Sequence, residues 1–461
     1  MGVDLDLSNG KVRVVDIALK TLNNLPMKRS LLSLLVILTL IAPSHATAAV
    51  KAGGVCKQSG QSSTVAGKRY TCVKSGNKLV WSKGVTVTKA KPSPSPTPSK
   101  VSTLHTSNLI TASDQLTALE VCKTKDLTTR NSGNNGFPRP AGTLIGAVSP
   151  KILFIPLSFP DTPAFSDNDL TVVQGVFKEV IDFYQKTSYG LVKIEYVVLE
   201  KSKWVIMDKT AASYGLTYPQ PQQNNTEALK EILNKVDPSV NFDLYDGVTF
   251  ETARYVGGGV GQAFLSERFA TKNGVAKGVS LETAQNAARF QVLAHELGHT
   301  LFGLEDLYVF LNAARPSVPG GPNPAGSWDM MSNSSRAFFG WSKFLNGWLD
   351  GGQVRCITNQ PKSVHYLEDI DRSGERPKLL TINLQEGVTI STEVRCRELY
   401  NYSDCGALIY KIDSRINHGD GPITAESSLL SEGNSKLIDG WRITALKNGG
   451  EGMLIEVEKV G

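Results

Sequence analysis

The pentapeptide His295-Glu296-Leu297-Gly298-His299 decides how the rest of the chain is understood. On an α-helix, residues four apart lie one turn above each other on one face, so both imidazoles can reach a single metal ion. Glu296 lies beside the first histidine, where its carboxylate can reach a water molecule on the same ion. The pattern H-E-x-x-H is typical of zinc-dependent peptidases.

The helix that carries this pattern is expected to begin near Ser280. A serine can cap the first turn, and good helix formers fill much of the stretch from 281 to 289. Val292, His295 and His299 then recur at three- and four-residue steps along one stripe. The sequence leaves one alternative open, in which the two histidines are satisfied core or surface residues and Glu296 is a solvated charge.

A tetrahedral zinc site with two histidines needs a third protein ligand and an open position for water. No glutamate occurs between Asp306 and Leu367, which excludes a glutamate ligand from a helix in that stretch. Gly303 can supply the positive φ that ends the helix and turns the chain back. Counting from this glycine selects Asp306, whereas counting from His299 selects Glu305. We favour Asp306, because the turn should fix the ligand more tightly than the length of the helix end, and we keep Glu305 as the alternative.

A candidate Met-turn follows in Gly326-Ser327-Trp328-Asp329-Met330-Met331-Ser332. In metzincins a methionine in such a turn forms the hydrophobic floor under the zinc. We expect Met331 to lie under the metal and Met330 to be a core residue.

Further motifs occur in a fixed order on both sides of the zinc helix. They are LFIPLSFPD (153–161), FYQKTSYG (183–190), WDMMS (328–332), FGWSK (339–343), GWL (347–349) and GALIYKID (406–413). Together with H-E-x-x-H they make the chain similar to the immune inhibitor A family of secreted bacterial zinc metallopeptidases, which is metzincin-like. The similarity spans roughly residues 150 to 415, and an ordered series is far more specific than one motif. Gly303, one position later than in the metzincin pattern, is the main departure.

The expected fold is α/β (α+β). In a zincin-like catalytic domain at 150–350, strand-like runs alternate with helix-like runs, and a mostly β C-terminal part at 351–461 continues the peptidase unit. The runs are strands Ile152–Phe159, Val192–Leu199 and Gly247–Phe250, helices Leu170–Lys186 and Thr226–Val236, and C-terminal strands Leu379–Leu384, Gly387–Val394, Leu408–Ile412 and Met453–Val457. Before the zinc helix, Gly257-Gly258-Gly259-Val260-Gly261 is either a flexible loop near the cleft or, more simply, a surface connection.

With 461 residues the chain exceeds a typical single domain, so two or three modules are expected. Residues 1–48 are assigned to a leader and signal peptide. Met27-Lys28-Arg29 begins a basic segment, Leu31–Ala42 is an apolar run too short to span a bilayer, and Ala46-Thr47-Ala48 fits a signal-peptidase site. We hypothesise that translation starts at Met27; an uncleaved anchor is the alternative. The expected location is extracellular or at the cell envelope, with no stable membrane span after cleavage.

Six cysteines in an exported chain favour disulfides. Near-neighbour spacing suggests Cys56–Cys72 and Cys396–Cys405, which leaves Cys122–Cys356 by subtraction. The competing hypothesis makes Cys122 a thiolate on zinc in a latent precursor.

Positive charge is concentrated near the N-terminus. Residues 49–100 hold ten Lys or Arg and no acid. Within them, 49–85 are expected to form a small disulfide-stapled β module, followed by a semi-rigid Pro/Ser/Thr linker at 86–103. The charge suggests binding to anionic cell-wall polymers, with a plain spacer domain as the alternative. Residues 104–149 form either an N-terminal wrap or a propeptide.

These observations predict a secreted zinc endopeptidase that hydrolyses proteins or peptides. Zinc lowers the pKa of its water towards about 7, and Glu296 takes the water proton and delivers it to the leaving amine. Tyr308 or His418 could donate to the oxyanion, although a structural tyrosine and an exposed loop histidine are the simpler interpretations. The rival is an envelope-binding protein with an inactive peptidase-like scaffold, which has no physical reason to keep Glu296. Structural calcium is a second candidate cofactor, and no nucleic-acid partner is expected.

Overall fold

The computed structural model describes residues 2–4, 13–15, 51–56, 62–65, 68–76, 78–86, 111, 115–128, 134–216, 226–236, 238, 240–253, 261–264, 268–282, 289–310, 321–332, 336–396, 405–426 and 428–461. They belong to two compact units, one formed by 1–22 with 105–461 and the other by 23–104. No helix in the described part of the chain is both long and apolar enough to cross a membrane.

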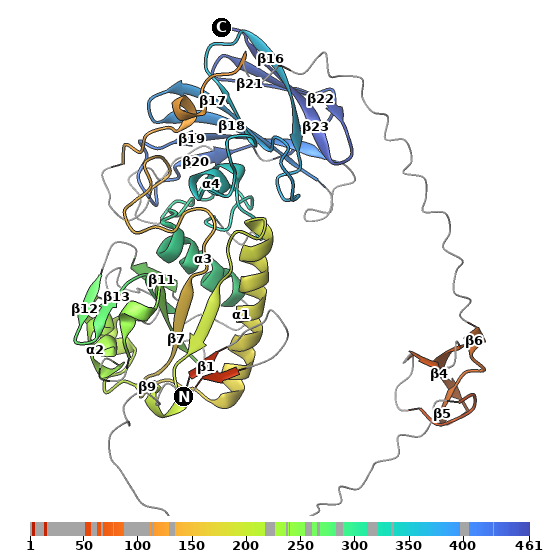
Figure 1. Ribbon diagram of the computed structural model, residues 1–461, viewed down its shortest axis with the longest axis vertical. Helices are drawn as coiled ribbons and strands as arrows, with labels where there is room; N and C mark the ends of the chain where they lie inside the picture. Colours follow the sequence, from red (N-terminus) through yellow and green to blue (C-terminus); the bar gives the residue numbers. More distant parts are fainter. Residues whose placement is uncertain are drawn as a thin grey trace, which may run out of the picture. The chain divides into compact units, whose positions relative to one another are not determined.

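An eight-stranded mixed sheet forms the base of the larger unit (Figure 1). Strands β7, β8, β10 and β14 are parallel, and β11 runs antiparallel to β14 at one edge. The strand order is β11 (Gly261–Phe264), β14 (Val279–Glu282), β10 (Gly247–Thr252), β7 (Lys151–Ser158), β8 (Glu195–Val198), β1 (Gly2–Asp4) and β2 (Arg13–Val15), with β9 (Val205–Ile206) beside the end of β7. A separate hairpin pairs β12 (Phe269–Thr271) with β13 (Gly274–Ala276).

Helices cover both faces of this sheet. Alternate residues of β7 point to opposite sides: Phe154 contacts the core under α1 (Asp167–Thr187) and α3 (Arg289–Phe302), and Ile155 the core under α2 (Thr226–Val236). A central strand buried on both faces must be apolar nearly throughout, which explains the continuous run in β7. The expected mixed α/β architecture is confirmed.

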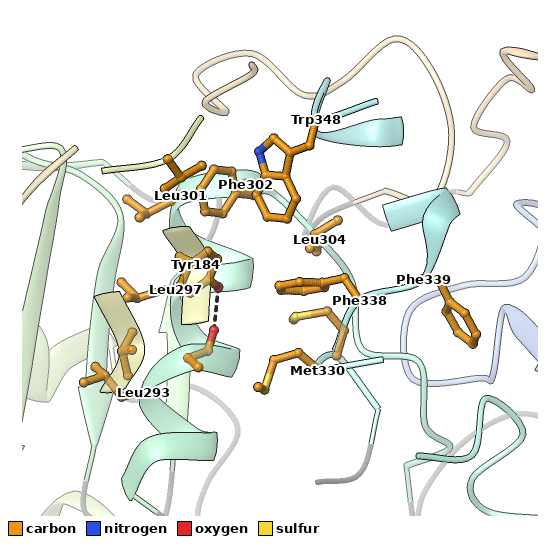
Figure 2. Packing of buried hydrophobic residues seen from close by; sticks show 14 of the residues in the cluster. Tyr184, Leu293, Leu297, Leu301, Phe302, Leu304, Met330, Phe338, Phe339 and Trp348 are labelled. Carbon is orange, nitrogen blue, oxygen red and sulfur yellow. Dashed lines mark hydrogen bonds between the residues drawn. The ribbon is translucent and has the colours of Figure 1, made fainter. Parts of the chain in front are cut away.

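The packing of α3 against α1 fixes which way the histidines face. Leu293, Leu297 and Leu301 recur every four residues and lie in the core, where the Tyr184 hydroxyl of α1 donates to the carbonyl of Ala294 at 2.6 Å (Figure 2). His295 is two positions from this leucine stripe, and a step of two residues leads to the opposite side of a helix. The core contacts therefore direct the H-E-x-x-H face away from α1.

The expected start of the zinc helix is wrong. Ser280 lies in strand β14, paired with Thr249 of β10, and α3 begins at Arg289. Residues 283–288 lie outside the described part. The pairing of Val279–Glu282 between two strands outweighs the local helix propensity of Leu281 and Glu282.

The C-terminal part is mostly β, as expected. Its two sheets enclose a common apolar core that includes Ile382, Ile390, Ile443 and Ile455. One sheet has the order β15 (Val354–Ile357), β17 (Leu379–Gln385), β18 (Val388–Arg395), β19 (Gly406–Asp413), β20 (Ile423–Ala425); the other has β16 (Lys362–Glu368), β23 (Gly452–Lys459), β22 (Trp441–Asn448), β21 (Ser435–Ile438).

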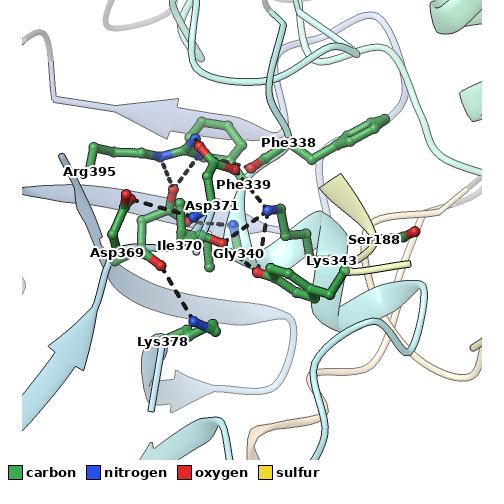
Figure 3. Close-up of polar contacts among 12 residues, drawn as sticks. Ser188, Phe338, Phe339, Gly340, Lys343, Asp369, Ile370, Asp371, Lys378 and Arg395 are labelled. Carbon is green, nitrogen blue, oxygen red and sulfur yellow. Dashed lines mark hydrogen bonds and ion pairs between the residues drawn. The ribbon is translucent and has the colours of Figure 1, made fainter. Parts of the chain in front are cut away.

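Helix α4 (Gly340–Leu345) lies where the two parts meet (Figure 1). The core of the α1–α3 face continues past α4 to Tyr410 of β19. Beside it, Arg395 donates to Asp371 at 3.2 Å and to the carbonyl of Phe338 at 2.8 Å, and Lys343 donates to Asp371 at 2.9 Å (Figure 3). Removing one partner of such a buried pair is far more destabilising than breaking a surface pair, so loss of any of these three side chains should weaken the junction.

The segment before β7 braces the C-terminal end of α3. The Arg139 guanidinium donates to the carbonyls of Phe302 at 2.5 Å and Gly303 at 3.0 Å, and the Leu144 amide donates to that of Leu301 at 2.8 Å. A disulfide joins Cys122, at the end of η3 (Leu119–Cys122), to Cys356 of β15. An N-terminal wrap and a propeptide would both make such contacts, so both expectations for residues 104–149 stand; this segment is called the wrap below.

The smaller unit is an antiparallel β module. Strand β4 (Lys68–Ser75) pairs with β3 (Ser62–Val65), β5 (Lys78–Trp81) and β6 (Val85–Thr86). Its small core is formed by the Cys56–Cys72 disulfide and Trp81. With Cys396–Cys405, all three expected disulfides are present. Residues 87–103 of the expected linker at 86–103, and the basic and apolar segments at 27–48, lie outside the described residues.

Candidate metal centre

The two histidines of α3 point at a common position. Their Nε2 atoms lie 3.0 Å apart, and the two rings are nearly perpendicular, with centroids 4.7 Å apart. Both side chains are largely buried, with 13% of His295 and 5% of His299 exposed. The helical spacing thus produces the geometry that a shared cation requires.

Backbone carbonyls set the tautomer of both rings. Nδ1 of His295 lies 2.9 Å from the carbonyl oxygen of Met330, and Nδ1 of His299 lies 2.7 Å from that of Leu304. A carbonyl can only accept, so each Nδ1 donates its proton. In the neutral imidazoles the lone pair is therefore on Nε2, which is the state that binds a metal.

Gly303 returns the chain to the histidines. Its φ is +59°, its amide donates to the carbonyl of His299 at 2.8 Å, and the next amide, that of Leu304, donates to Gly298 at 3.1 Å. A side chain at Gly303 would also overlap Thr143 of the wrap. Both the left-handed backbone and the close contact require glycine at this helix end.

Asp306 then completes a group of three metal-donor side chains. Its Oδ1 lies 2.9 Å from Nε2 of His295 and 3.2 Å from Nε2 of His299. These three residues form the one group of at least three His, Cys, Asp or Glu side chains with ligand atoms within 4.8 Å of one another among the described residues. Two imidazole lone pairs and a carboxylate oxygen make a nitrogen–oxygen donor set that suits zinc.

Glu305, the alternative ligand, faces elsewhere. It is fully buried, and its Oε2 accepts from the side-chain amide of Asn135 in the wrap at 2.7 Å. The turn at Gly303 therefore directs consecutive acids to different places, with Asp306 on the histidines and Glu305 against the wrap.

The charges of the group are strongly coupled. Burial alone would lower the pKa of His295, but the hydrogen bond and charge of Asp306 outweigh it and raise that pKa to about 9. Burial would raise the pKa of Asp306, yet the two histidines hold it well below its ordinary value. A carboxylate that stays ionised beside two imidazoles is a site for a positive charge.

The Met-turn lies directly under α3. A β-carbon on Gly298, between the two histidines, would overlap the sulfur of Met331, so this methionine packs against the helix backbone there. Asp329 holds the turn by accepting from the amides of Met331 at 2.8 Å and Phe339 at 2.6 Å. Burial raises the pKa of Asp329 to about 6 against these hydrogen bonds. Both methionines are buried, and Met330 also supplies the carbonyl that orients His295.

Glu296 is buried on the side of α3 that faces the sheet edge. A β-carbon on Gly261, the first residue of β11, would overlap Oε1 of Glu296. Burial raises the pKa of the Glu296 carboxyl, and the charges of His295 and His299 partly offset this. The carboxylate thus lies against the backbone of an edge strand, within the electrostatic influence of both histidines. The rest of the glycine-rich stretch, 257–260, lies outside the described residues.

Two further side chains approach the group. The Tyr308 ring lies 6.1 Å from that of His295, and burial together with the charge of Asp306 raises the pKa of Tyr308 well above its ordinary value. His418, on the connection between β19 and β20, lies 3.4 Å from Oδ2 of Asp306 through Nε2. His418 is not the exposed loop residue that was the simpler expectation, since only 15% of its side chain is exposed.

Comparisons with known proteins add little to this geometry. No family model matches the chain, and no curated protein matches it. Among solved structures, the chain is similar to a catalytically inactive form of OgpA from Akkermansia muciniphila in complex with an O-glycopeptide substrate, glycodrosocin. The similarity covers 71% of this chain and 96% of that chain, at 11% identity and a TM-score of 0.24. A score this low carries no inference about activity.

Proposed function

We propose that the chain is a secreted zinc-dependent endopeptidase. The observation that carries the proposal is the convergence of His295, His299 and Asp306, with Glu296 buried beside them. The donor set leaves room for a fourth ligand, as in catalytic rather than structural zinc sites. The three disulfides support an extracellular location.

Each residue has a role in this proposal. His295, His299 and Asp306 hold the metal, and their carbonyl partners keep the rings in place. When bound, the metal supplies a Lewis acid that lowers the pKa of water towards about 7 and polarises the scissile carbonyl. Glu296 accepts the proton of the attacking water and delivers it to the leaving amine. A buried carboxylate with a raised pKa is a better proton acceptor than one in solvent.

The position of β11 at the edge of the sheet is an argument for a peptide as the substrate. Strand β11 ends the described strand order, so its outer side has no strand partner there. An extended peptide can add to such an edge through main-chain hydrogen bonds. Because β11 begins against Glu296, a peptide bound along it would pass the carboxylate.

Tyr308 and His418 are the two candidate oxyanion donors, and the side chains of both also interact with Asp306. The protonated nitrogen of His418 faces Asp306, because Nδ1 of this ring accepts from the Asp306 amide at 3.3 Å. The Tyr308 ring lies beside His295, and burial keeps its hydroxyl protonated. A neutral hydroxyl at this position can donate to a developing oxyanion.

The small N-terminal unit supports a second role, attachment to anionic cell-wall polymers. Its lysines 51, 68, 74, 78 and 83 are exposed, and no acidic residue occurs between 49 and 100 to pair with them. Binding through these charges must weaken as salt screens them. The full chain should bind purified cell walls at low salt and release at high salt; a lack of binding at low salt would remove this role.

Hydrolysis of casein by the purified protein tests the proposal, with and without a chelator. We expect chelation to abolish turnover, and Glu296→Ala to lower it by about 10² to 10⁴. Glu386→Ala, which removes an exposed glutamate of the C-terminal part, is the matched control and should leave turnover unchanged. Unchanged turnover in Glu296→Ala would contradict the mechanism. An intact, folded protein without any peptidase activity would favour the scaffold alternative.

A further inference from the structure

We propose that His418 is a positioning residue that fixes the Asp306 carboxylate for the metal, so that the C-terminal part completes the metal centre. The inference rests on the proposed zinc site. It goes beyond that site because it assigns a role to a residue over 100 positions from the zinc helix, on the connection between β19 and β20.

The two carboxylate oxygens of Asp306 have different neighbours, and His418 is the neighbour of one of them. The Asp306 amide donates to Nδ1 of His418 at 3.3 Å, so Nδ1 is the acceptor and the proton of the neutral ring is on Nε2. Nε2 lies 3.4 Å from Oδ2 of Asp306, while Oδ1 faces the two zinc-helix histidines. One carboxylate oxygen is thus directed to His418 and the other to the metal position.

His418 is not itself a metal ligand in this arrangement. The ligand atoms of His295, His299 and Asp306 lie within 4.8 Å of one another, and His418 is outside that group. Its ring centroid is 6.2 Å from that of His299. Its position is that of an outer partner, which orients a ligand rather than binding the ion.

Backbone pairing holds His418 in place. The Phe310 amide donates to the carbonyl of Gly419 at 2.8 Å, and Val309 forms an antiparallel bridge with Asp420. The Phe310 ring meets the His418 ring edge-on, with centroids 5.0 Å apart. A β-carbon on Gly419 would overlap the Phe310 ring, so the approach needs glycine there. The segment that carries Asp306 is therefore paired directly with the C-terminal part.

Zinc affinity tests the proposal without measuring catalysis. We would titrate the metal-free full chain and its variants with zinc against a chromophoric chelator, and record the visible spectrum of the cobalt-substituted forms. Loss of an outer partner lowers metal affinity by about 10- to 100-fold, which we expect for His418→Ala together with a changed cobalt spectrum. His418→Gln keeps an amide donor near the Nε2 position and should restore part of the affinity.

Two controls make the outcome decisive. Arg415→Ala removes an exposed residue of the same connection and should bind zinc as the wild type does. Melting of the metal-free forms shows whether the His418 variants are folded. Wild-type affinity and an unchanged cobalt spectrum in folded His418→Ala would overturn the positioning role and leave the proposed function standing. A wild type that binds no zinc would overturn the metal centre and this inference with it.

Discussion

Gly261 of β11 and Glu296 of α3 are in such close contact that a β-carbon on the glycine would overlap the glutamate carboxylate. The same β-carbon would lie 2.6 Å from Cγ1 of Val292, one turn earlier on the helix. Between these two side chains there is no room for even a methyl group. The contact with the edge strand therefore fixes the position of the Glu296 carboxylate, the proposed general base.

This contact predicts the effect of Gly261→Ala. The added methyl group must displace Glu296, so we expect kcat for casein to fall by about 10- to 100-fold, a part of the usual contribution of a general base. The zinc content should not change, because Gly261 does not touch the three ligands. Gly175→Ala is the matched control, since a β-carbon there meets no atom within 4 Å. Equal kcat values for the two variants would show that the contact does not position Glu296.

The wrap should be needed for the stability of the larger unit. Arg139 donates to two carbonyls at the C-terminal end of α3, and burial lowers its pKa to about 10. Arg139→Ala leaves these acceptors without their charged donor, at a cost of about 1.5 to 3 kcal/mol in the free energy of unfolding. Urea unfolding measures this. Arg442→Ala, which breaks the exposed pair with Glu458, should cost less than about 1 kcal/mol. If both variants unfold alike, the wrap does not brace the helix.

Acid should destabilise the C-terminal part through His365 of β16. Burial, and then the charge of Arg355, lower the pKa of this histidine to about 4 from 6.5. Above pH 6.5 His365 is mostly neutral in the folded and in the unfolded protein, and it does not reduce the free energy of unfolding. As pH falls from 6.5 towards 4, His365 takes up a proton in the unfolded chain first, which stabilises the unfolded state and lowers the free energy of unfolding. Between pH 7 and 4.5, the wild type should lose about 2 kcal/mol more stability than His365→Gln. Parallel pH profiles of urea unfolding for the two proteins would contradict this.

Local patterns predicted most of the fold. Helix α2 begins and ends where its apolar spacing placed it, and the apolar run of β7 and the alternating C-terminal runs are strands. Cysteine spacing predicted two of the disulfide pairs, and subtraction predicted the third, Cys122–Cys356. The start of α3 was wrong because the neighbours of β14 in the sheet, which are distant in the sequence, decide the state of Ser280.

Only those residues of the candidate site that lie close together in the sequence could be predicted. The H-E-x-x-H spacing and the count from Gly303 selected three side chains that the structure brings together. The sequence did not predict the contacts of Asn135, Arg139 and Gly261. His418 was expected to be an oxyanion donor or an exposed loop residue, and not a partner of Asp306. Each reaches the site through contacts between segments far apart in the chain, for which the sequence offers no short-range pattern.

Zinc content tests the central claim, that His295, His299 and Asp306 hold a metal ion. Wild type, Asp306→Ala and Glu305→Gln would be dialysed against buffered zinc and analysed for bound metal. A single site predicts about one ion per chain in the wild type and in Glu305→Gln, and a large loss in Asp306→Ala. A wild type without zinc, or a loss in Glu305→Gln with full binding in Asp306→Ala, would contradict the account.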